Sequence, residues 1–181
     1  FESYTELQEA RRKARNEAKG EGDLAKKFAG TVRQKLAPMY LDQVAARYQV
    51  AVQSEESFRE RLVHFWTNHF AVSADKPQLI ALAGTLENEA IRPHVGGRFV
   101  DLLLAAESHP AMILYLDNHV SVGPSSKLAQ RAAKRRRNQE RKLGINENLA
   151  REILELHTLG VNGGYSQADV TAFAQALTGW S

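Results

Sequence analysis

Apolar side chains recur along most of this chain at the three- and four-residue spacing of amphipathic helices. No stretch alternates polar and apolar residues for long enough to indicate a β-strand. Prolines and glycines divide the pattern into segments of helical length, and Pro38 is expected to end one helix before the next begins. The sequence therefore predicts an all-α fold, a multi-helix bundle.

The expected helices have recognisable start or stop signals. Pro77 and Pro110 suit the first turn of a helix, Gly160 suits a helix end, and Ser166 with Asp169 forms a capping-box pattern. The helical segments delimited in this way cover residues 3–19, 23–38, 39–52, 58–70, 77–91, 98–108, 111–118, 147–159 and 170–180.

With 181 residues, 43% of them hydrophobic, the chain is long enough for a buried core, and its length favours a single helical domain over residues 1–181. It starts at Phe1 and stops at Ser181, soon after a helical pattern, so we expect a fragment of a longer protein. Cysteine is absent, which leaves His, Asp and Glu as the ligands for any metal ion. No stretch approaches the roughly 20 apolar residues of a membrane span.

The net charge of +3 is concentrated in one segment. Residues 120–144 contain eight basic residues and one acid, whereas the rest of the chain has 16 basic and 20 acidic residues. This segment opens with Gly123 and Pro124 and has few large apolar residues, so we expect a long, flexible basic loop, partly helical around residues 129–137. It contains no aromatic residue and no nucleic-acid-binding motif, so nucleic acid is not an expected partner.

Two histidines, His69 and His157, fall on the apolar sides of predicted helices at about 100° per residue. The stripe around His157 contains Ala150, Ile153, Leu154 and Leu156, and the stripe around His69 contains Phe58, Leu62, Val63, Phe65, Trp66 and Phe70. A buried imidazole nitrogen without a partner costs on the order of 1 to 3 kcal/mol. Each ring must therefore meet a polar group.

Two interpretations of these histidines remain open. In the first, both are core residues bonded to a backbone carbonyl or a carboxylate. In the second, His69 and His157 approach each other across a helix pair and, with a carboxylate from Asp117, Glu89 or Glu152, bind a divalent metal ion or act as acid and base. No helix carries two histidines at the four-residue spacing of a metalloprotease helix, so such a site needs more than one helix.

Four stretches of the sequence resemble, in order, the bacterial family known as "domain of unknown function 1800". They are HFWTNHFAVSADKP at 64–77, ENEAIRPHVGGRFVDLL at 87–103, HPAMILYLDN at 109–118 and NENLAREILELHTLGVNGGYSQADVTAFAQALTGW at 146–180. The last stretch is the longest and the most specific. The segment 120–144 coincides with a region in which family members vary, which agrees with the predicted loop.

The resemblance implies a longer protein and assigns no reaction. Many family members carry export signals, which implies a periplasmic or secreted location, and many are encoded beside sulfatase-like proteins, which implies such a protein as a partner. The motif positions that match here are largely polar: Trp66, Asn68, His69, Asp117, Asn118, Asn146, Asn148, Arg151, Glu152, Glu155, His157 and Thr158.

We expect the helix over 58–70 to pack near the helix over 147–159, so that polar groups from distant segments form one cluster. The catalytic candidates are His69, Asp117, Glu152 and His157, with His69 and His157 also as metal ligands; the binding candidates are Asn68, Asn118, Asn148, Arg151 and Glu155. The leading hypothesis is a site for metal-assisted or acid–base chemistry on an unknown substrate. The contrasting hypothesis is a non-catalytic scaffold or partner-binding module whose buried polar network fixes the helix register.

Overall fold

The computed structural model describes residues 9, 12–13, 15–16, 21–134 and 144–180, and over these residues the chain forms helices and loops without a strand. The all-α prediction is confirmed. The helix expected over residues 3–19 lies largely outside the described part. The elements are α2 (Glu21–Gln53), α3 (Ser57–His69), η1 (Pro77–Leu79), α4 (Ala83–Leu86), η2 (Glu87–Ile91), α5 (Arg92–His94), α6 (Phe99–Glu107), α7 (Pro110–Tyr115), η3 (Asn118–Val120), α8 (Lys127–Lys134), α9 (Asn148–Glu152), η4 (Ile153–Thr158) and α10 (Gln167–Leu177).

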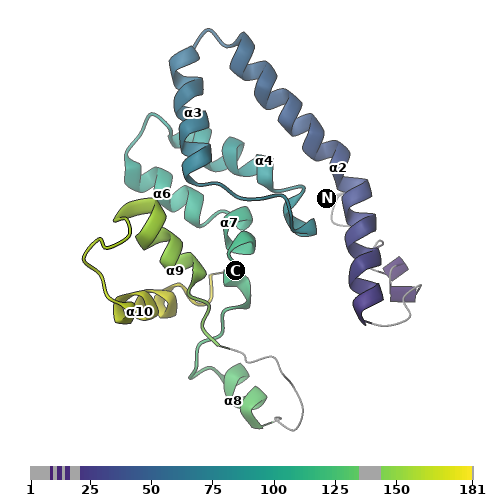
Figure 1. The fold of residues 1–181 in the computed structure, drawn as a ribbon, viewed down its shortest axis with the longest axis vertical. Helices are drawn as coiled ribbons and strands as arrows, with labels where there is room; N and C mark the ends of the chain where they lie inside the picture. Colours follow the sequence, from purple (N-terminus) through teal and green to yellow (C-terminus); the bar gives the residue numbers. More distant parts are fainter. Residues whose placement is uncertain (1–8, 10–11, 14, 17–20, 135–143, 181) are drawn as a thin grey trace.

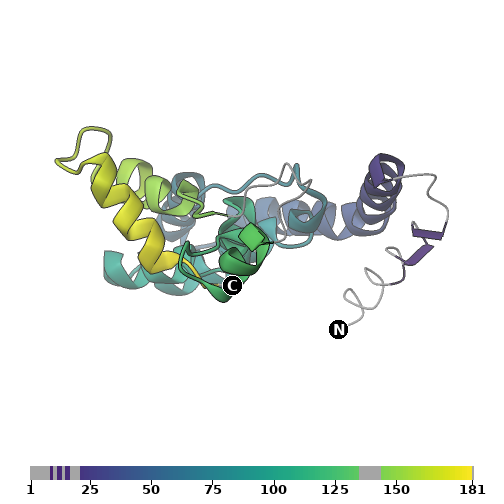
Figure 2. The ribbon, with the colours of Figure 1, turned by 90° about the horizontal axis from the view of Figure 1, so that it is seen from below.

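The helices are arranged around a central group, with a long arm on one side. Figure 1 shows α2 as a rod that is joined by a tight turn to α3, while α4, α6 and α7 lie in the middle. Helices α9 and α10 form the end of the molecule opposite α2, and Figure 2 shows the same separation from below. No helix in the described ranges is long and apolar enough to cross a membrane.

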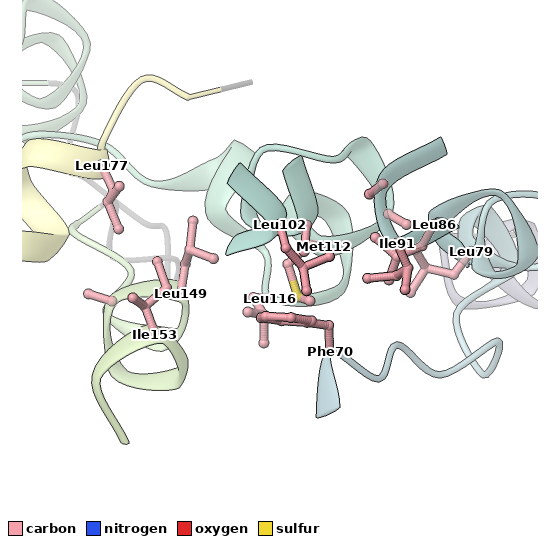
Figure 3. Packing of buried hydrophobic residues seen from close by; sticks show 14 of the residues in the cluster. Phe70, Leu79, Leu86, Ile91, Leu102, Met112, Leu116, Leu149, Ile153 and Leu177 are labelled. Atoms are coloured by element: carbon pink, nitrogen blue, oxygen red, sulfur yellow. The ribbon is translucent and has the colours of Figure 1, made fainter. Parts of the chain in front are cut away.

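One hydrophobic cluster joins the central helices to α9 and α10 (Figure 3). It includes Phe70, Ile91, Met112 and Leu149, each at most 1% exposed. Burial of a side chain of this size contributes about 1.5–3 kcal/mol. The cluster therefore connects α9 to the end of α3 through the central helices, which positions His69 and His157.

Helix α2 runs without interruption through Pro38, so the predicted break at this residue is wrong. Pro38 lies on the exposed side of the helix, where water can reach the carbonyl group that loses its hydrogen bond. Two residues earlier, Leu36 is 2% exposed and packs against Ile80. This contact anchors the helix beside the proline.

Two π-helical turns interrupt the α-helical geometry, η2 between α4 and α5 and η4 after α9. Each residue of a π-helix advances less around the axis than in an α-helix, because the hydrogen bonds span five residues. The stripe predicted at about 100° per residue therefore fails in part: His157 is buried as expected, whereas its neighbour Leu156 is 60% exposed. Helix α3 is regular, yet Phe58 and Phe65 are exposed, although the spacing of about 100° per residue predicted them on the buried side.

The basic segment begins as a loop over residues 121–126 and continues as a helix. Lys127–Lys134 forms α8, which confirms the predicted partial helix, and residues 135–143 lie outside the described ranges. The Ser126 hydroxyl accepts a hydrogen bond from Ala129 N–H at 3.1 Å. Val122 N–H donates to the carbonyl of Gly144 at 2.9 Å, so the two ends of the segment lie together.

Candidate functional site

His157 and Glu107 form a buried pair at the centre of the candidate site. Nδ1 of His157 lies 2.6 Å from Oε1 of Glu107, and the two side chains are 5% and 3% exposed. The oxygen lies off the direction of an Nδ1–H bond, so neither Nδ1 nor either Glu107 oxygen has a well-aligned hydrogen-bond partner among the described residues. The facing imidazole is the polar group that the described residues place against this buried carboxyl group.

His69 contacts the same residue from the end of α3. Its Nε2 lies 3.2 Å from the carbonyl oxygen of His157, and the two rings have centroids 5.5 Å apart. The structure thus brings together the two histidines that the sequence paired, although the hydrogen bond joins a ring to the backbone. Donation from Nε2 leaves Nδ1 of neutral His69 without a proton.

The local backbone explains why His157 O accepts this bond. In the π-helical turn η4, the N–H groups of Leu159 and Gly160 both donate to the carbonyl of Leu154, at 3.1 Å each. Carbonyl groups in the last turn of a helix lack partners within the helix, and His69 supplies one for His157. Gly160, at φ 84°, ends the helix as predicted.

Aromatic rings surround the two histidines. Phe70 lies with its ring centroid 5.0 Å from that of His157, and Trp66 lies 5.3 Å from His69 in an edge-on arrangement. Phe65 stacks on His69 with centroids 6.4 Å apart and is 58% exposed. The His157–Glu107 pair therefore lies beside groups of low polarity, which strengthen its electrostatic interaction, and an exposed apolar edge lies beside His69.

The carboxylates proposed from the sequence lie elsewhere. Glu107 is in contact with His157, whereas Glu89 contacts Nε2 of His109 at 3.2 Å. Glu152 is half-exposed and has no hydrogen bond or ion pair within the described part of the chain. No three His, Asp or Glu side chains converge there as an ion site.

Asp117 and Asn118 contact groups at or near the ends of helices. Asp117, in the left-handed region at φ 58°, lies 2.8 Å from Lys76 Nζ, which also donates to two carbonyls at the end of α7. Asn118 is 1% exposed, and its amide donates to the carbonyls of Leu177 at 3.1 Å and Trp180 at 3.2 Å. Asn118 therefore holds the end of α10 rather than facing the histidines.

Asn146 and Asn148 join the start of α9 to the end of α7. The Asn146 amide donates to the carbonyls of Leu116 and Asp117 at 3.1 and 3.0 Å, and the Asn148 amide reaches Leu116 O at 3.4 Å. The Asn148 backbone N–H donates to Asn146 Oδ1 at 2.9 Å. These asparagines supply partners for helix-end groups that would otherwise lack them.

Arg151 and Glu155 belong to a network between α9 and α10. Arg151 donates to Glu155 Oε1 at 2.9 Å and to Glu147 Oε2 at 3.0 Å. Glu147 also accepts hydrogen bonds from Thr171 at 2.8 Å and Gln167 at 3.0 Å, and these bonds, together with Arg151, hold the pKa of Glu147 below its ordinary value. The network links the two helices at the surface, away from the buried pair.

A second buried charge network, missed from the sequence, joins α3, η2 and α5. Arg92 donates to both oxygens of Glu60, at 2.7 and 2.9 Å, and to Glu87 at 2.9 Å; Arg47 Nε lies 2.7 Å from the other Glu87 oxygen. The hydrogen bonds from Arg92 hold the pKa of Glu60 below its ordinary value despite its burial. Asn68, a predicted binding residue, is exposed and shares the wall of a neighbouring cavity with Arg47 and Arg92.

The sequence did contain a signal for the missed acids. Glu107 follows Leu103 by four residues, and Glu87 precedes Ile91 by four, so each acid shares a helical stripe with an apolar residue. An acid that shares a stripe with apolar residues is expected to be buried, as His157 is expected to be for the same reason. Their partners come from other segments, however, and no spacing in the sequence links them.

The fold and the site define a class: an all-α protein whose core contains an imidazole–carboxyl pair beside a π-helical turn. The chain belongs to the family described as protein of unknown function (DUF1800), whose family model matches residues 2–181. This result confirms the resemblance of the four motif stretches. No curated protein and no solved structure matches the sequence.

Proposed function

We propose that His157 and Glu107 form the acid–base pair of an enzyme whose substrate is unassigned. The observation that carries the proposal is their 2.6 Å contact inside the core, at 5% and 3% exposure. An apolar pair of similar volume is usually no less stable than a buried charged pair. Stability alone is therefore a weak reason for its presence, whereas titratable pairs in desolvated surroundings are common at sites that transfer protons.

The two ring nitrogens of His157 have different roles in this proposal. Nδ1 faces Glu107, whose contact at 2.6 Å holds the imidazole in place. Nε2 makes no hydrogen bond with the described residues and is the nitrogen that takes a proton from a substrate or an attacking water. His69 is a positioning residue, because its contact is with the backbone of His157.

A structural role for the same residues is the second candidate. It is favoured by the bond from His69 to the carbonyl of His157, which completes a helix end and joins α3 to η4. In this case the Glu107–His157 pair sets the register of α6 against η4 and takes part in no reaction.

Turnover of model substrates distinguishes the two functions. The full-length protein is incubated with p-nitrophenyl esters, phosphates, sulfates and glycosides, and any activity found is measured again in His157→Gln and His94→Gln. General acid–base catalysis predicts a loss of about 100-fold or more in His157→Gln and a change of less than about twofold in His94→Gln, since His94 only caps the carbonyl of Ala90. Activity that survives in folded His157→Gln would reject the acid–base role.

We also propose a test of the metal-assisted form of this chemistry, in which His69 and His157 hold a divalent ion. Support comes from the 5.5 Å separation of the two rings. Elemental analysis of the full-length protein and of the His69→Ala/His157→Ala double variant is expected to show an ion that is lost in the variant. A metal content that is unchanged by the two substitutions would reject these ligands.

We propose, from the family resemblance, that the protein acts outside the cytoplasm with a sulfatase-like partner. Fractionation of the native cells with a tagged full-length protein tests the location. Co-purification from the same cells tests the partner. Recovery of the tagged protein only with cytoplasmic markers would contradict the location, and co-purification without a sulfatase-like protein would contradict the partner.

A further inference from the structure

A cavity of about 300 Å³ lies between α2 and the helices α3, α4 and η2. Its polar side is formed by Gln43, Arg47, Thr67, Asn68, Asn88 and Arg92. Tyr40, Val44 and Leu86 contribute apolar surface to the same wall. Its volume is at the lower end of the range for small-molecule sites, and it is separate from the His157–Glu107 pair, which does not line it.

Of the two arginines among the described lining residues, Arg47 has more unused donors than Arg92. Glu87, 4% exposed, is the acid in the lining, and its two oxygens already face Arg92, Arg47 and Thr67. Arg92 directs three donor contacts to Glu60 and Glu87. Arg47 contacts Glu87 through Nε, whereas its two terminal nitrogens make no hydrogen bond with the described residues.

Gln43 belongs to the lining, but its oxygen is not open to the cavity. Gln43 Oε1 is fully buried and packs against Gly84, and its amide nitrogen lies 3.5 Å from the carbonyl of Ala81. A bound molecule therefore meets the guanidinium group of Arg47 rather than this oxygen.

We propose that this cavity binds a small organic carboxylate that carries an apolar group. The carboxylate meets the terminal nitrogens of Arg47, since guanidinium and carboxylate groups form paired, charge-assisted hydrogen bonds. The apolar group lies against Tyr40 and Val44. The contact between Glu87 and Arg47 Nε holds the guanidinium group in place.

Mandelate is a suitable probe because it combines a carboxylate with an aromatic ring. Titration of the ¹⁵N-labelled full chain with mandelate is expected to give saturable amide shifts at Thr67, Asn68 and Asn88. Mandelamide, which lacks the charge, is expected to bind about tenfold more weakly, whereas phenylacetate, which keeps the charge and the ring, is expected to bind within about threefold of mandelate.

Matched variants distinguish binding in the cavity from nonspecific attraction of mandelate to positively charged side chains. Arg47→Met is expected to weaken mandelate binding by about tenfold or more, whereas Arg33→Met, an exposed arginine of the same helix, changes it by less than about twofold. Ala83→Leu, which narrows the cavity and keeps every charge, is expected to weaken binding even if Arg47→Met does not fold.

The proposal is overturned by either of two results. One is the absence of saturable shifts at the cavity residues with mandelate and phenylacetate up to about 50 mM, well above the millimolar affinities of weak sites. The other is equal weakening by Arg47→Met and Arg33→Met, or equal binding of mandelate and mandelamide, because either would show that no specific contact with Arg47 exists.

Discussion

Glu107, at the end of α6, lies against His157 in the π-helical turn η4, with Oε1 2.6 Å from Nδ1. Fifty positions of sequence separate the two residues, and the hydrophobic cluster that joins α6 and α7 to α9 brings them together. The ring of His157 is thereby held between a carboxyl group and Phe70. This arrangement makes predictions about stability, pH dependence and the position of a proton.

Replacement of one partner should cost more than replacement of both. His157→Phe leaves the Glu107 carboxyl group in an apolar site and is expected to lower the free energy of unfolding by about 3–5 kcal/mol. The double variant Glu107→Met/His157→Phe removes both polar groups at similar volume, and it is expected to come within about 1 kcal/mol of the unmodified protein or to exceed it.

Urea unfolding followed by tryptophan fluorescence measures these differences. His94→Phe is the control, since His94 bonds to a carbonyl of its own helix at 2.8 Å. If the losses in Glu107→Met and His157→Phe simply add in the double variant, the two residues are not coupled.

Lowering the pH should remove the contribution of the Glu60 carboxylate to the free energy of unfolding. Because Arg92 donates to this carboxylate, the pKa of Glu60 in the folded protein lies below its ordinary value of 4.5. The folded state therefore binds this proton less readily than the unfolded state, so the stabilisation is fully present above the ordinary pKa and is lost as the pH falls through the folded one.

The matching measurement is the free energy of unfolding of Glu60→Gln as a function of pH. At pH 7 the variant is expected to be less stable by about 1.5–3 kcal/mol, the range for hydrogen bonds to charged groups. The difference should shrink as the pH is lowered from about 5 to about 3. Glu55→Gln, at an exposed position before α3, should show neither effect, and a pH-independent gap in Glu60→Gln would contradict the role of the carboxylate charge.

Asn118 should stabilise the end of α10. Its amide donates to the carbonyls of Leu177 and Trp180, so Asn118→Ala is expected to cost about 1–3 kcal/mol and to speed hydrogen exchange at the last residues of α10. Asn68→Ala, at an exposed position, should change stability by less than about 0.5 kcal/mol. Unchanged exchange at residues 175–180 in Asn118→Ala would contradict this assignment.

Local signals predicted much of the helical architecture. His109 caps α7 directly before Pro110, and Ser166 with Asp169 forms the predicted capping box of α10. These features depend on residues that are close in sequence. The break predicted at Pro38 is wrong for the opposite reason, because Leu36 and Tyr40, on either side of the proline, pack in one cluster with the distant Ile80.

The candidate site was predictable only in part. His69 and His157 stand out as polar residues on apolar stripes, and the structure places their rings 5.5 Å apart. Glu107 was missed because its partner lies fifty residues away in the sequence. The π-helical turn was missed because residue spacing does not reveal its hydrogen bonds, and this turn leaves Leu156 exposed beside the buried His157. That residues 1–181 form a single domain stays a prediction.

The position of the proton on neutral His157 tests the central claim most directly. The ¹⁵N chemical shifts of its two ring nitrogens distinguish the two tautomers. The same measurement in Glu107→Gln, with the shifts of His94 as an internal reference, shows whether Glu107 determines which tautomer of His157 is more populated. If Glu107 orients the ring for acid–base chemistry, Nδ1 carries the proton and Nε2 does not, and Glu107→Gln weakens this preference. A proton on Nε2, or a tautomer that is unchanged in Glu107→Gln, would contradict the account.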